Sequence, residues 1–134
     1  MRTSAALDCS FSARPASVAA ARRVVREWLR VSMTVSDMVV ADVALAVSEA
    51  CTNVVVHAYP EGHNGDATFH VRARCEDGGV HISVTDHGRG LVPRPDSPGA
   101  GLGLPVIASV TESVDMGSTE DGTGTVVAMR FLAA

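Results

Sequence analysis

An acidic residue stands at the end of a predicted strand, directly before a glycine-rich loop. Asp86 shares its parity with the apolar positions 80, 82 and 84, so in a strand its side chain points to the same covered face. A buried carboxylate is unfavourable unless it receives hydrogen bonds, and Gly88 and Gly90 remove side chains where a flat ligand would approach the backbone. An adenine amine would donate to Asp86, whereas guanine presents an acceptor at that edge. An Asp-Gly turn without a ligand is the alternative interpretation.

A polar row occupies the second predicted helix. Glu49, Asn53 and His57 recur at every fourth position, which stacks them on one helix face beside the apolar arc. A carboxylate and an amide oxygen one turn apart can hold a hydrated magnesium ion and a hydroxyl group, as phosphate chemistry requires. The alternative is that Asn53 and His57 only hydrogen-bond neighbouring backbone groups.

Two further groups complete the predicted site. Gly101 and Gly103 lead into a helix from Leu104, and backbone N–H groups at such a helix start attract phosphate. This loop lacks both the G-x-x-x-x-G-K-S/T signature and the dinucleotide fingerprint. Thr125 has inward parity in the last strand, so its hydroxyl is a candidate partner of Asp86, although a β-branched residue also simply suits a strand.

The elements that must position these groups follow from hydrophobic periodicity. Helical spacing predicts three helices, at residues 15–30, 37–59 and 104–114. Alternation predicts five strands, at residues 7–11, 68–75, 80–84, 114–117 and 125–132. Pro15 suits a first helical turn, and Ser36 or Asp37 is the expected cap of the second helix. The expected fold is one α+β domain over residues 1–134, a two-layer sandwich whose mixed, mostly antiparallel sheet is covered by helices on one face.

Composition and charge narrow the function classes. The 134 residues suit one domain, and a net charge of −4 without a basic stripe argues against nucleic-acid binding. Cys9, Cys51 and Cys75 form no C-x-x-C pair, so neither a disulfide framework nor a zinc ribbon is expected. A signal peptide is not recognisable, and no uninterrupted apolar run approaches the roughly 18 residues of a membrane span. We therefore expect a cytoplasmic protein without a membrane partner.

Together these segments resemble the GHKL superfamily of ATPases, which includes gyrase-type, chaperone and sensor-kinase ATP-binding domains of the Bergerat fold. Three superfamily motifs occur in order: an N-box at residues 49–57, a first glycine box at 86–90 and a second at 101–104. A final Gly-Thr-Val-Val strand start follows at residues 124–127. Each motif is weak alone, whereas their order and spacing are specific. The similarity runs from about Pro15 to Phe131.

Within the superfamily, the sequence of residues 48–53 and 57–59 is most similar to the corresponding motif of bacterial anti-sigma-factor serine kinases. The resemblance implies that Glu49 is the general base, that Asn53 coordinates Mg²⁺, and that Asp86 binds the adenine of ATP with support from Thr125. Further nucleotide contacts are implied at Gly88, Gly90, Gly101, Leu102, Gly103 and Leu104, with a lid at residues 91–100. Relatives of this kind bind a sigma factor and phosphorylate an anti-anti-sigma protein of the STAS type. They are usually homodimers whose contacts include the first helix.

The sequence also departs from that pattern, which leaves alternatives open. The implied lid contains Pro93, Pro95 and Pro98, and Ala100 stands where many relatives carry a basic residue. These differences bear on the rate of phosphate transfer more than on nucleotide binding. The main alternative to a kinase is a regulatory module that binds ATP without transferring phosphate. A detached catalytic domain of a sensor histidine kinase and an α+β domain without nucleotide are weaker alternatives.

Overall fold

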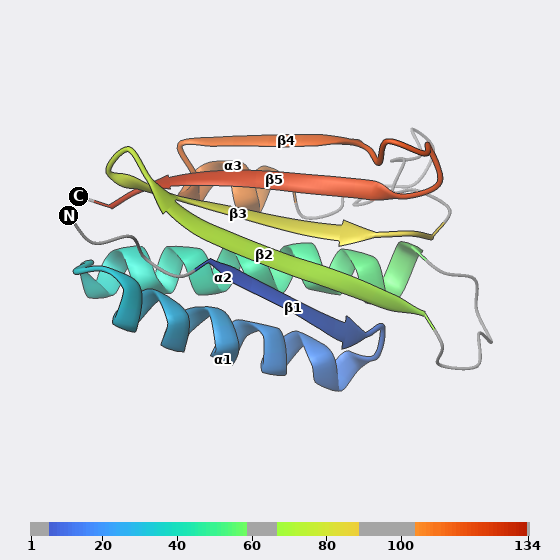
Figure 1. Ribbon diagram of the computed structural model, residues 1–134, viewed down its shortest axis with the longest axis horizontal. Helices are drawn as coiled ribbons and strands as arrows, with labels where there is room; N and C mark the ends of the chain where they lie inside the picture. Colours follow the sequence, from blue (N-terminus) through green and yellow to red (C-terminus); the bar gives the residue numbers. More distant parts are fainter. Residues whose placement is uncertain (1–5, 59–66, 89–103, 134) are drawn as a thin grey trace.

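The structure, a computed structural model, describes residues 6–58, 67–88 and 104–133. Five strands form one sheet in the order β1-β2-β3-β5-β4. They are β1 (Leu7–Ser12), β2 (Thr68–Glu76), β3 (Gly79–Asp86), β4 (Ser113–Ser118) and β5 (Thr125–Leu132). All four strand pairings among the described residues are antiparallel, so the sheet shows none of the mixed character that was predicted. The α+β sandwich is confirmed, with the helices on one face of the sheet (Figure 1).

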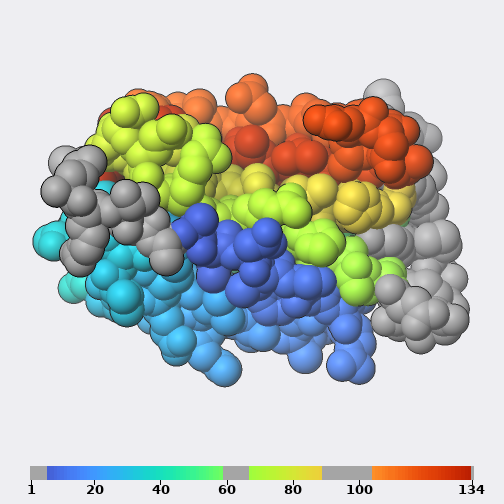
Figure 2. Space-filling view, in the orientation of Figure 1, coloured from blue at the N-terminus to red at the C-terminus, as the bar shows by residue number. Residues whose placement is uncertain are grey.

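Two long helices form most of the covering layer. They are α1 (Pro15–Ser32) and α2 (Asp37–Asn53), and α2 continues into a π-helical segment, η1 (Val54–Ala58). Pro15 occupies the first turn of α1, where its missing N–H leaves no bond unmade. The Ser36 hydroxyl caps α2 by accepting a hydrogen bond from the backbone N–H of Val39 over 3.2 Å. In the space-filling view β1 and α1 lie side by side in two shades of blue (Figure 2).

The core lies between this helical layer and the inner face of the sheet. α1 contributes Ala21, Val25 and Leu29, all fully buried. The strands contribute alternate residues, so Phe69 and Val71 point inward while their neighbours point outward. The β2–β3 turn has positive φ at Asp77 and Gly78, the backbone pattern of a type I′ hairpin that matches strand twist.

The third helix, α3 (Leu104–Val110), is shorter than the prediction of residues 104–114. It ends early because the chain joins the sheet, where the backbone N–H of Glu112 donates to the carbonyl of Arg130. The Thr111 hydroxyl bonds back to the carbonyl of Ile107 over 2.9 Å and satisfies part of the helix end. The predicted strand at 114–117 is therefore longer, at Ser113–Ser118.

The helical stretch Asp37–Ala58 is long and apolar enough to span a membrane by length and composition alone, with a mean hydropathy of 1.7. The expectation from uninterrupted apolar runs missed it, because Asp42 and Glu49 interrupt the run. The core helix of a globular fold meets the same criterion. Here Val43 and Val47 are fully buried in the core between α2 and the sheet.

The three cysteines are free thiols, as the sequence predicted. Cys51 is fully buried in α2, and burial raises the pKa of its thiol to about 12. Among the described residues no group of three or more His, Cys, Asp or Glu side chains gathers around a possible metal position.

Candidate functional site

Asp86 is the one acidic side chain buried in the described part of the chain, with 1% of its surface exposed. It ends β3, where strand pairing places it between Phe69 of β2 and Thr125 of β5. Its parity with Val84 turns it toward the helical layer, as alternation predicted. The inward direction of Asp86 and Thr125 is thus confirmed.

The two oxygens of the Asp86 carboxylate have different surroundings. Oδ1 accepts a hydrogen bond of 2.9 Å from the backbone N–H of Gly88. Oδ2 is buried and has no hydrogen-bond partner among the described residues. Burial raises the pKa of the carboxyl group, and the backbone N–H groups of Gly88 and Thr125 and the nearby His87 oppose that rise. The site therefore presents one unfilled acceptor on the covered side of the sheet.

Gly124 brings β5 close to this carboxylate, and sequence reasoning gave it no role. A Cβ atom at position 124 would lie 1.9 Å from the backbone oxygen of Asp86. Only glycine permits that approach, which places the backbone N–H of Thr125 near the Asp86 side chain. Thr125 was predicted to support Asp86 through its hydroxyl; its effect on the carboxyl pKa comes from its backbone N–H. The available signal was a glycine directly before an inward-facing strand residue.

The polar residues predicted to form a row on α2 differ in burial, and the last of them lies in η1. Asn53 is buried with 5% of its surface exposed, Glu49 is half-buried and His57 is exposed. His57 lies in η1, whose π-helical turn was not predicted. The stacking of all three side chains on one face stays a prediction. Glu49 and Asn53 stay one turn apart on regular helix, as predicted.

A hydrogen bond between the two long helices fixes α2 beside Glu49. Arg22 of α1 donates to the Ser48 hydroxyl over 3.1 Å, and that hydroxyl donates to the carbonyl of Ala44 over 2.8 Å. The contact is part-buried and spans 26 positions in the chain. It holds the residue that precedes Glu49 against the neighbouring helix.

Several predicted nucleotide contacts lie outside the described residues. These are Gly90, Gly101, Leu102, Gly103 and the lid at residues 91–100. Leu104 is described, and it begins α3 at the predicted position and packs against the core. Gly88 is also described, and its role is the N–H bond to Asp86.

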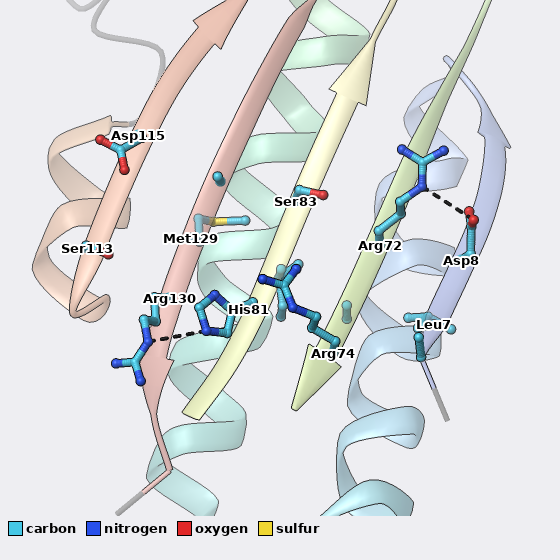
Figure 3. Close-up of a pocket in the computed structure, with 14 residues that line it drawn as sticks. Leu7, Asp8, Arg72, Arg74, His81, Ser83, Ser113, Asp115, Met129 and Arg130 are labelled. Carbon is cyan, nitrogen blue, oxygen red and sulfur yellow. Dashed lines mark hydrogen bonds and ion pairs between the residues drawn. The ribbon is translucent and has the colours of Figure 1, made fainter. Parts of the chain in front are cut away.

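The opposite face of the sheet carries a groove of about 460 Å³, which none of the sequence patterns predicted. Figure 3 shows Arg72 paired with Asp8 on one side of it and Arg130 bonded to His81 on the other. Asp86 does not line this groove. Ser83, near its middle, faces away from the core, so the groove and the buried carboxylate belong to different faces.

The chain is similar to a known protein family and to several relatives of known sequence. The family profile described as histidine kinase-like ATPase domain matches residues 11–131. An anti-sigma F factor from Pasteuria penetrans is 38% identical over 99 residues, covering 66% of this chain and 65% of that protein. A serine-protein kinase RsbW from Halalkalibacterium halodurans is 37% identical over 109 residues, covering 69% of this chain and 63% of that protein. The chain thus matches just under two thirds of the length of these relatives.

A solved structure has the same fold. The crystal structure of the RsbU and RsbW domains of Rv1364c from Mycobacterium tuberculosis matches with a TM-score of 0.73 over 96% of this chain and 32% of that chain. Its sequence identity is 22%, so the likeness concerns the fold alone. Since the family profile matches residues 11–131, nearly the whole chain, this chain belongs to the histidine kinase-like ATPase domain family.

Proposed function

We propose that this chain is an ATP-binding serine/threonine protein kinase of the anti-sigma-factor type. The observation that carries the proposal is the buried Oδ2 of Asp86, which has no hydrogen-bond partner in the described structure. Oδ2 can accept only from a donor, and the exocyclic amine of adenine is a donor of suitable size and charge. Guanine would bring a carbonyl oxygen to the same place and be repelled.

Asn53 and Glu49 supply the polar groups for phosphate chemistry. Asn53 would coordinate Mg²⁺ through its amide oxygen, and the ion would neutralise phosphate charge. Glu49 would accept the proton of a substrate serine while that serine oxygen attacks the γ-phosphorus and ADP leaves. Glu49 suits this role because it is half-buried and has no hydrogen bond or ion pair with another described residue.

The test is phosphate transfer to a purified candidate anti-anti-sigma protein of the STAS type. Glu49→Gln removes the proton acceptor and preserves side-chain shape. We expect phosphorylation to fall by about 100-fold or more, the usual scale for losing a general base, while ATP affinity stays within about twofold. Asp42→Asn on the same helix is the matched control and should retain full transfer.

Two outcomes would contradict parts of this proposal. Full activity in Glu49→Gln would remove Glu49 as the base. ATP binding by the wild-type chain without any transfer would leave the non-catalytic regulatory module, in which the nucleotide sets the shape of a partner-binding surface. A chain that binds neither ATP nor its analogues would remove both.

The proposed partners are a sigma factor and a STAS-type anti-anti-sigma protein, in the cytoplasm and without nucleic acid or membrane. Support comes from the relatives, which are named anti-sigma F factor and serine-protein kinase RsbW. The acidic net charge of −4 gives no reason to expect nucleic-acid binding. Co-purification with each candidate sigma factor, in ATP and in ADP, would identify the partner.

We also propose a homodimer that uses the groove face. Strand pairing aligns one row across this face, made of Asp8, Arg72, Ser83, Ala128 and Asp115. Two copies can pack these faces together about a two-fold axis that runs parallel to the strands between Ser83 and Ala128. This arrangement would place Arg72 of each copy opposite Asp115 of the other. Asp115 is exposed and has no ion pair within the described residues, so this pairing would supply its partner.

Sedimentation of charge variants tests this arrangement. Asp115→Arg should dissociate the dimer, and the double variant with Arg72→Asp should restore it, because the two charges are exchanged. If Asp115→Arg stays dimeric and Arg26→Glu on the exposed side of α1 dissociates the protein, the contacts run through the first helix instead. Such a result would overturn the groove-face dimer.

A further inference from the structure

The β4–β5 turn is organised around one carboxylate. Asp121 Oδ1 accepts hydrogen bonds from the hydroxyl of Thr119 (2.6 Å), the backbone N–H of Thr123 (3.1 Å) and the hydroxyl of Thr123 (2.8 Å). The turn is closed by a backbone bond from Gly122 to Thr119 over 2.9 Å. Asp121 therefore replaces the regular strand bonds that the turn cannot make.

The turn is connected to the buried carboxylate through Thr119 and Gly124. The Thr119 hydroxyl donates to Asp121 and accepts from the backbone N–H of Gly124 over 3.0 Å. Gly124 is the residue whose missing Cβ lets β5 lie directly against the backbone of Asp86. The next N–H, that of Thr125, acts on the Asp86 carboxyl group. A chain of hydrogen bonds thus runs from an exposed acid to the start of β5.

We propose that Asp121 is a positioning residue for nucleotide recognition, acting through Thr119 and Gly124 to set Asp86 and Thr125. The inference rests on the proposed ATP-binding function. Asp121 is exposed and lies in a turn outside the covered face, so it acts without touching the base. Substitution of Asp121 would let the start of β5 move away from Asp86, and Oδ2 of Asp86 would then be held less firmly in one position.

The charge state of Asp121 suits this role. Its hydrogen bonds with Thr119 and Thr123 lower the pKa of its carboxyl group to about 2, with a smaller contribution from His87. His87 also lowers the pKa of Asp86, so one imidazole lies near both acids. The Asp121 carboxylate therefore remains a full acceptor throughout the physiological pH range.

The test compares two acids of the same turn. Asp121→Ala removes the hydrogen-bond acceptor. Glu120→Ala removes the same charge from an exposed neighbour that has no hydrogen bond or ion pair with another described residue. Isothermal titration with Mg-ATP should give a dissociation constant raised about three- to tenfold in Asp121→Ala, the range expected for one or two lost hydrogen bonds. Glu120→Ala should match the wild type.

Two further variants separate positioning from folding. Thr119→Val breaks the chain of hydrogen bonds to Gly124 and should weaken ATP to a similar degree, whereas Thr119→Ser keeps the hydroxyl and should restore wild-type affinity. Asp121→Asn keeps one acceptor oxygen and should bind ATP between the wild type and Asp121→Ala. The melting temperature without nucleotide should change little in this set, while the ATP-induced rise in melting temperature shrinks.

The outcomes distinguish this inference from the proposed function. If the wild type binds ATP and Asp121→Ala binds it as tightly as Glu120→Ala does, the turn has no positioning role. If affinity falls only in proportion to lost stability without nucleotide, the role is structural and the inference is overturned. If the wild type does not bind ATP, the proposed function fails, and this inference fails with it.

Discussion

Acidic side chains on the two faces of the sheet differ in burial and in their partners. On the helix-covered face Asp86 is 1% exposed and one of its oxygens has no partner in the described structure. The other face and its rim keep Asp8, Glu76 and Glu112 at the surface, each beside an arginine. The same sheet thus has one buried carboxylate that is unfavourable for folding and several exposed acids that are paired with arginines.

The difference identifies which charge serves function. Exposed ion pairs contribute about 0–1 kcal/mol each, because water already solvates both groups. A buried acceptor without a donor lowers the free energy of unfolding, so folding alone gives no reason to keep Asp86. A ligand that donates to Oδ2 gives one, which is why we propose this face, and not the groove face, for nucleotide binding.

The largest expected effect on the free energy of unfolding comes from removing a packed side chain on the covered face and comparing it with a substitution on the exposed face. Phe69→Ala removes a fully buried ring from the covered face and should lower the free energy of unfolding by about 3–5 kcal/mol. Arg74→Ala, on the opposite and exposed face of the same strand, should lower it by less than about 1 kcal/mol. Urea unfolding measures both, and equal losses would contradict the assignment of faces.

Gly124→Ala should come next. The new Cβ would collide with the backbone oxygen of Asp86 at 1.9 Å, and relief by strand movement should lower the free energy of unfolding by about 1–3 kcal/mol. Gly117→Ala in β4 is the matched control, since its Cβ would meet nothing within 4 Å. ATP affinity should fall with the first substitution and not with the second; retention of affinity in Gly124→Ala would show that close approach is dispensable.

Asp86→Asn should stabilise the nucleotide-free protein by on the order of 1 kcal/mol at neutral pH, because it removes a buried charge. Burial raises the pKa of Asp86 in the folded protein, so ionisation lowers stability above that pKa. As pH falls through the raised pKa toward the unfolded value of 3.8, the wild type should recover stability relative to the variant. A pH-independent difference between the two proteins would contradict the stated cause.

The smallest effect belongs to the groove face. Asp8→Asn breaks the exposed pair with Arg72, whose atoms lie 3.4 Å apart, and should change the free energy of unfolding by about 0–1 kcal/mol. Added salt should shrink even that difference. A larger, salt-independent loss would mean that this face also contains a buried electrostatic contact.

Local periodicity predicted the parts of the fold that depend on neighbouring residues. Alternation alone gave the inward direction of Asp86 and Thr125, because side chains in a strand change face at every residue. The Ser36 cap and the start of α1 at Pro15 were likewise predictable from helix-end chemistry.

The parts that sequence reasoning missed depend on distant segments. Gly124 matters because β5 pairs with β3, and although the glycine before an inward-facing residue is visible in the sequence, its contact with Asp86 depends on that pairing. α3 ends early because Glu112 bonds to Arg130 in another strand. The π-helical η1 was not predicted either, because a change of helix type leaves no mark in hydrophobic spacing.

The central claim is that Oδ2 of Asp86 accepts a hydrogen bond from the adenine amine. Mg-ATP and the triphosphate of purine riboside, which lacks only that amine, should be titrated into the wild type and Asp86→Asn, with GTP as a further comparison. We predict that the wild type binds ATP about 10- to 100-fold more tightly than the amine-free analogue and GTP, as a hydrogen bond to a charged group allows, and that Asp86→Asn loses this preference. Equal binding of ATP and the analogue by the wild type would contradict the claim.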